Sequence, residues 1–126
     1  MKGSRPAPMD IRKLQKTVIN ALEAVKAREI ENFDVKHLTT LFDRVIIASA
    51  DSARQAKALV NHLREDLRAV GGKIHGVEGE ESGEWVLVDA GEIVVHIMQP
   101  AVRAYYNLEE LSTPPTPVRR VKPPAA

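Results

Sequence analysis

The 126-residue sequence has no cysteine, few aromatic residues and no long apolar run. The lack of cysteine excludes disulfides and thiolate metal sites, and it is typical of proteins in reducing compartments. No stretch has the length of a membrane span, and the N-terminal residues lack the apolar region of a signal peptide. Because this length and a hydrophobic content of 44% suffice for one core, we expect a single-domain cytoplasmic protein that contacts no membrane.

Motifs of common catalytic and metal sites are also missing. The sequence has no HExxH, GxGxxG or Walker A pattern, and no DxD or ExxH pair of carboxylates. The histidines are not spaced for joint metal binding on one helix, and no serine has a recognisable base partner. We therefore expect no enzyme activity, no cofactor and no metal. The residues weighed for these roles are His37, His62, His75, His96, Ser49, Ser52, Glu80 and Glu81.

Charge is distributed unevenly along the chain. Basic residues lie in both terminal segments, whereas the body between Met9 and Leu111 has 13 basic and 17 acidic residues. An acidic body does not favour a folded surface that tracks nucleic-acid phosphates. It favours a basic protein as partner.

Hydrophobic periodicity predicts one α/β domain with a mixed sheet of about five strands flanked by helices. One helix is expected from Asp10 to about Val25, and a second begins at Asp51 or Ser52 and ends at Gly71-Gly72. The remaining expected elements are strands at 30–38, 44–50, 73–77, 84–90 and 93–98 and a short helix from Pro100 with Arg103, Tyr105 and Tyr106. Residues 1–9 are predicted to be a flexible leader, 10–111 the domain, and 112–126 a disordered proline-rich basic tail.

The segment from Val77 to Met98 is the most informative for function. It contains the only tryptophan, Trp85, together with six carboxylates and no lysine or arginine. Strand alternation places Trp85, Leu87 and Asp89 on one face. Because burying an unpaired aspartate is costly, we expect this face to be partly wet and Trp85 to be partly exposed, with a core position as the alternative.

Two further positions stand out as candidate contacts. His96 interrupts the apolar run IVVHIM, either as a satisfied polar group near the sheet or as a contact residue, and we favour contact. Tyr105 and Tyr106 are adjacent, so on a helix their side chains diverge by about 100°. We expect one of them to be a surface anchor.

Several segments in fixed order resemble the ribosomal silencing factor family, also called the Iojap-like family. After an N-terminal amphipathic helix come RVIIASADSARQAKAL, GVEGEESGEWVLVDAGEIVVHIM and RAYYNLEEL, and the resemblance spans residues 9–111. It implies an α/β domain similar to nucleotidyltransferases without their catalytic acids. It also implies binding to ribosomal protein L14 of the large ribosomal subunit, a steric block to joining of the small subunit, and repression of translation under nutrient limitation. By position in the shared motifs, the residues expected to face that partner are Trp85, Glu78, Asp89, His96 and Tyr106.

The resemblance leaves other functions and partners open. An assembly or maturation factor for the large subunit would use the same surface, and a divergent nucleotidyltransferase would need a magnesium-binding acid pair that is not visible. Ser112 stands where many members have tryptophan. The tail has two interpretations: a weak contact with ribosomal RNA through Arg119, Arg120 and Lys122, or a merely solubilising role, which we favour. A homodimer could form through an exposed hairpin edge.

Overall fold

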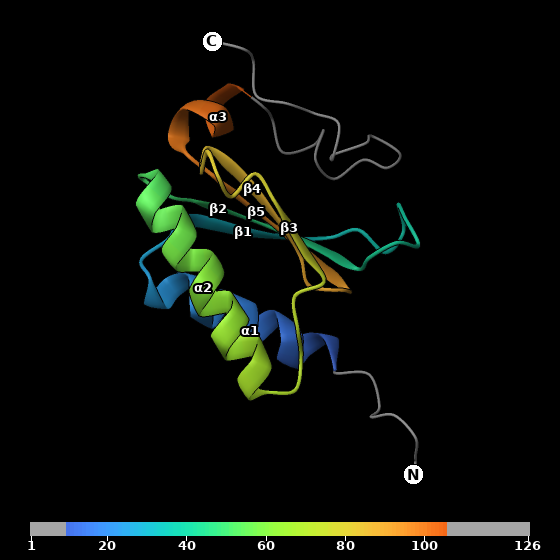
Figure 1. The fold of residues 1–126 in the computed structure, drawn as a ribbon. Coiled ribbons are helices and arrows are strands. Elements are labelled where there is room, and N and C mark those ends of the chain that lie inside the picture. The colour runs from blue at the N-terminus through green and yellow to red at the C-terminus, as the bar shows by residue number, and fades with distance from the viewer. Residues whose placement is uncertain (1–9, 106–126) are drawn as a thin grey trace.

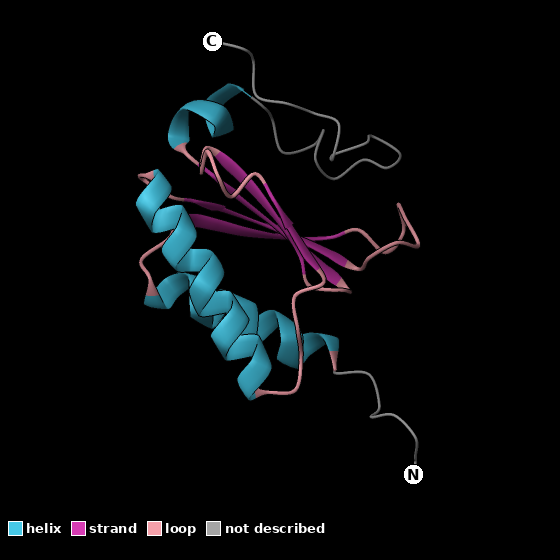
Figure 2. Cartoon of the chain, in the orientation of Figure 1, coloured by secondary structure: helices cyan, strands magenta, loops and turns pink. Residues whose placement is uncertain are grey.

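A computed structural model describes residues 10–105 of the chain. A five-stranded sheet forms one layer, and two long helices lie together on one of its faces (Figures 1 and 2). The elements in chain order are α1 (Ile11–Ala24), β1 (Arg28–Asp34), β2 (Arg44–Ser49), α2 (Ala53–Ala69), β3 (Gly76–Glu78), β4 (Trp85–Asp89), β5 (Ile93–Met98) and α3 (Pro100–Tyr105). This order and the mixed sheet confirm the predicted fold class. The predicted leader and tail lie outside the described residues.

The strands lie side by side in the order β1-β2-β5-β4-β3. Neighbouring strands pair antiparallel except β2 and β5, which pair in parallel over six residue pairs from Arg44↔Ile93 to Ser49↔Met98. A parallel pair needs a crossover connection, and α2 with the β3–β4 hairpin supplies it. The two central strands are therefore distant in sequence.

The ends of both long helices follow the expected capping chemistry. The Asp10 side chain accepts a hydrogen bond from the Arg12 backbone N–H, and Ser52 accepts one from the Gln55 N–H. Gly71 has a φ of +87°, and the Gly72 N–H donates to the Leu67 carbonyl at 2.7 Å. Glycine adopts this left-handed conformation without a steric penalty, so α2 ends where the sequence predicts.

Two predicted strands have different bounds in the structure. β1 ends at Asp34, because the Asp34 carboxylate accepts from the Lys36 N–H at 3.0 Å and the chain turns there. Residues 35–38, which were predicted to continue this strand, lie outside it. β3 covers Gly76–Glu78 and not 73–77, because its pairing partner is β4, whose Asp89 lies opposite Gly76.

Apolar side chains gather on both faces of the sheet. The larger cluster lies between the sheet and the helices α1 and α2, and it includes Val18, Leu22, Leu59, Ile46 and Val95. The second cluster lies on the opposite face, which we call the outer face, and its buried members are Val35, Val45, Ile47, Trp85, Met98 and Val102. Val102 comes from α3, which lies at one end of the sheet (Figure 1). Within residues 10–105, no helix is long and apolar enough to cross a membrane.

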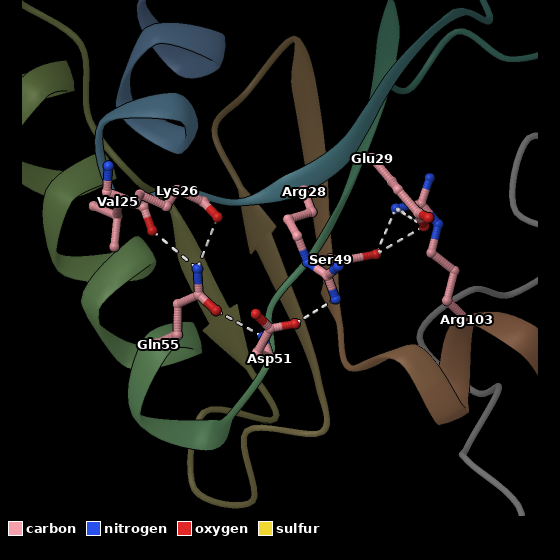
Figure 3. Close-up of polar contacts among 8 residues, drawn as sticks. All are labelled: Val25, Lys26, Arg28, Glu29, Ser49, Asp51, Gln55 and Arg103. Carbon is pink, nitrogen blue, oxygen red and sulfur yellow. Dashed lines mark hydrogen bonds and ion pairs between the residues drawn. The ribbon is translucent and has the colours of Figure 1, made fainter.

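Gln55 joins the end of α1 to the start of α2 (Figure 3). Its amide nitrogen donates to the carbonyls of Val25 at 2.9 Å and Lys26 at 3.0 Å, and its amide oxygen accepts from the Asp51 N–H at 2.6 Å. Lys26 has a φ of +64°, so the chain turns sharply at this point. One side chain therefore satisfies three backbone groups from two turns.

We predict that Gln55→Ala lowers the free energy of unfolding by about 1–3 kcal/mol, because the partly buried Val25 carbonyl and two more exposed backbone groups lose their partners. Urea unfolding followed by circular dichroism measures this change. Asn61→Ala is the matched control, since Asn61 is exposed on the same helix and its side chain accepts a hydrogen bond from Arg64. Equal midpoints for the two variants would contradict the role of Gln55.

Candidate partner-binding surface

The strand register brings four of the predicted site residues to the outer face. Glu78 lies opposite Leu87, Leu87 opposite His96, and His96 beside Ile47. Directly paired residues project to the same face of a sheet. Trp85 and Asp89 alternate with Leu87 along β4 and so share this face. The structure thus unites Glu78, Trp85, Asp89 and His96, whereas Tyr106 lies outside the described residues.

The prediction that Trp85 is partly exposed is wrong, because Trp85 is only 8% exposed. The alternative, a core position, agrees with the structure. Asp89 is exposed as expected, but it lies four residues further along β4, roughly 13 Å away. The two ends of one strand therefore have different surroundings. The indole packs with Met98 and Val102 in the outer-face cluster, at the end of the sheet beside α3.

His96 is fully buried, and its partner is Trp85. The indole Nε1–H donates to His96 Nδ1 at 2.9 Å, and the two ring centroids are 5.9 Å apart. Of the two interpretations of His96, the structure of the isolated chain agrees with the satisfied polar group near the sheet. Any contact of this imidazole with a partner stays a prediction. A lone histidine and a lone tryptophan on adjacent strands were the sequence signal for this pair.

Burial lowers the pKa of His96 from 6.5 to about 4, because a charged imidazolium is poorly solvated inside the protein. The imidazole is therefore neutral at pH 7. Since Nδ1 accepts the indole hydrogen bond, we assign the proton to Nε2. Within the described part of the chain, Nε2 is the buried side-chain atom without a hydrogen-bond partner.

The solvent-facing part of this surface lies toward β3 and the β4–β5 turn. Glu78 and Asp89 are exposed, and Leu87 between them is partly exposed. Neither carboxylate forms an ion pair with another described residue. Asp89 also accepts from the Gly91 N–H at 2.9 Å, which stabilises the turn. The arrangement therefore offers negative charge beside a small apolar area.

Sequence reasoning missed Arg103 as a site residue. Arg103 lies on α3, and its Nη1 donates to Ser49 Oγ at 2.7 Å (Figure 3). The same guanidinium lies 3.7 Å from a carboxylate oxygen of Glu29 and 3.7 Å from one of Glu31. Nothing in the spacing of these residues along the chain suggested the contact, because it depends on β1, β2 and α3 meeting. Tyr105, one of the two tyrosines considered as a surface anchor, is 64% exposed.

The other polar residues considered for catalysis or metal binding do not form a common site within residues 10–105. Ser52 is the cap of α2, and Ser49 contacts Arg103 and Glu29 but no histidine. His62 lies 3.5 Å from Asp66 on the partly exposed side of α2. Among residues 10–105, no group of three or more histidines and carboxylates could hold a metal ion.

Known proteins share this fold and sequence. A family model described as "Ribosomal silencing factor during starvation" matches residues 8–122. A Chromobacterium violaceum protein named "Ribosomal silencing factor RsfS" is 52% identical over 103 residues, which are 82% of this chain and 84% of that protein. A crystal structure of a protein from the same organism has a TM-score of 0.78 and 52% identity, covering 82% of this chain and 86% of that one.

A more distant relative comes from Mus musculus and is named "Mitochondrial assembly of ribosomal large subunit protein 1". It is 30% identical over 99 residues, and the matched part is 76% of this chain but only 43% of that protein. The fold is thus a mixed α/β domain shared with a solved relative of high identity. The chain belongs to the ribosomal silencing factor family.

We predict that His96 makes the stability of the protein depend on pH between about 6.5 and 4. In this range the unfolded chain binds a proton while the folded imidazole stays neutral, so stability falls as the pH falls. The loss is on the order of 3 kcal/mol for this group. Urea unfolding at pH 7 and pH 4 measures it.

His96→Asn is the matched variant for this measurement, because its amide oxygen can still accept from Trp85 Nε1 but does not titrate. Carboxylate titration affects both proteins alike. The unmodified chain should therefore lose more stability than the variant as the pH falls. An equal loss in both would show that His96 does not titrate with a lowered pKa.

Proposed function

We propose that this chain binds the large ribosomal subunit through ribosomal protein L14, blocks association with the small subunit sterically, and so represses translation under nutrient limitation. Membership of the ribosomal silencing factor family supports a ribosomal role. The observation that carries the proposed contact is that Glu78 and Asp89 are exposed, and Leu87 partly exposed, together on the outer face.

The chemistry of this surface suits a basic protein partner. Carboxylates that form no ion pair within residues 10–105 speed the encounter with a positively charged surface and fix its orientation. Leu87 adds apolar area between them. Trp85 and His96 lie beneath the surface, so in this proposal they hold β4 and β5 in position. Tyr106 remains a proposed contact outside the described residues.

A second candidate function is assembly or maturation of the large subunit. The name of the mouse relative states such a role for that protein. The same outer face would bind the subunit, but subunit joining would not be its target. The two functions therefore differ in their effect on joined ribosomes and not in the surface used.

Sedimentation of purified subunits in sucrose gradients tests these functions. With the chain present, we expect co-migration with the large subunit and fewer joined ribosomes. Co-migration with unchanged joining would favour the assembly role. If the chain stays at the top of the gradient at low salt, ribosome binding by this chain is wrong.

We predict that Glu78→Lys with Asp89→Asn slows association with the large subunit about tenfold at low salt, with a smaller difference at high salt. Asparagine at 89 keeps an acceptor for the Gly91 N–H. The control is Glu23→Lys with Glu65→Gln, which changes the net charge equally at exposed positions on the helices. Equal rates for the two double variants, measured by stopped flow, would move the interface elsewhere.

Two additional contacts are also part of this proposal. Arg119, Arg120 and Lys122 would touch ribosomal RNA weakly, and they lie outside the described residues. A homodimer would use the edge strand β3, which is the outermost strand of the sheet on that side. Light scattering across a concentration series tests the homodimer.

A further inference from the structure

An almost buried arginine joins α3 to the two strands at one side of the sheet. The Arg103 side chain is only 10% exposed. It donates to Ser49 Oγ at 2.7 Å, and Ser49 in turn lies 3.5 Å from Glu29 Oε1 (Figure 3). Ion pairs of 3.7 Å to Glu29 and Glu31 complete the group. We call these four residues the α3 latch.

The backbone of β1 is distorted where it meets the latch. Its register against β2 shifts between Arg28 and Glu31, and Glu29 within the shift has a φ of +52°. A residue with a Cβ atom adopts this left-handed conformation at a cost in free energy. The irregularity lies where the Glu29 carboxylate contacts both Ser49 and Arg103, so local strain and the latch occur together.

The latch has an evident task, because α3 is too short to be stable alone. It has six residues, and isolated helices of that length do not form in water. Val102 holds it through the outer-face apolar cluster, and Arg103 holds it through the latch. Tyr105 is exposed on this helix, and Tyr106 follows it directly in the sequence.

We propose that Arg103 is a positioning residue for the partner-binding surface. By bridging β2 and β1, it fixes α3 across the end of the outer face and so sets where Tyr105 lies relative to Leu87 and Asp89. This inference rests on the proposed binding to the large subunit. It goes beyond that proposal because it assigns a function to a group that does not itself face the partner.

The bond to Ser49 is the strongest link in the latch. Glu29 and Glu31 are largely or half exposed, and water weakens ion pairs at such positions. Ser49 is 2% exposed, and hydrogen bonds to charged groups are stronger where water is excluded. Because Ser49 is buried, it cannot contact the ribosome. The substitution Ser49→Ala therefore weakens the positioning of Arg103 without removing a group that could contact the ribosome.

The experiment combines Ser49→Ala and Arg103→Lys with two measurements on the full chain. Hydrogen exchange at the amides of Val102 and Arg103, which donate to the Gln99 carbonyl, reports the stability of α3. Equilibrium binding to purified large subunits reports function. Arg54→Lys is the matched control, because Arg54 is exposed on α2 and forms no ion pair with a described residue.

We expect faster exchange at both amides and an affinity lower by about tenfold in both latch variants, with the control unchanged. A loss of affinity in Arg103→Lys but not in Ser49→Ala would mean direct contact and overturn the positioning role. Faster exchange with unchanged affinity would overturn it too. If the unmodified chain does not bind large subunits, the proposed function fails, and the exchange data alone then decide whether the latch holds α3.

Discussion

The parallel pairing of β2 with β5 fixes where α3 begins and which residues it can contact. It aligns Ser49 with Met98 at the same end of the sheet. Because α3 begins two residues after Met98, the helix starts beside Ser49, and Arg103 comes within reach of it. The pairing also sets Met98 between Ser49 and Trp85. The apolar and polar attachments of α3 thus follow from one strand register.

The hydrogen bond between Trp85 and His96 is a polar contact that depends on how β4 pairs with β5. Tryptophan N–H groups usually find a partner when buried, and here the partner is an imidazole on the adjacent strand. A shift of β4 by one residue would move the Trp85 ring to the other face of the sheet, away from His96. The pair therefore favours one register over its neighbours, at the cost of keeping an imidazole neutral in the core.

Most elements could be predicted from local pattern, and the exceptions are informative. Asp10, Ser52 and Gly71 mark helix ends through interactions within a few residues of each position, so sequence alone reveals them. The ends of β1 and β3 depend on the partner strand and were placed less well. The faces of β4 followed from alternation. The burial of Trp85 could not be predicted in this way, because it depends on Val102 and the other outer-face residues that cover this end of β4.

Four features could be predicted without a structure: the helix caps, the alternation of the strands, the acidic segment around Trp85 and the motifs of the ribosomal silencing factor family. Each of these depends on neighbouring residues or on the order of residue types. The folded chain was needed to show that Trp85 donates to His96 inside the protein and that Arg103 contacts Ser49, Glu29 and Glu31. These contacts join residues from different strands and helices, so they exist only once the sheet has assembled.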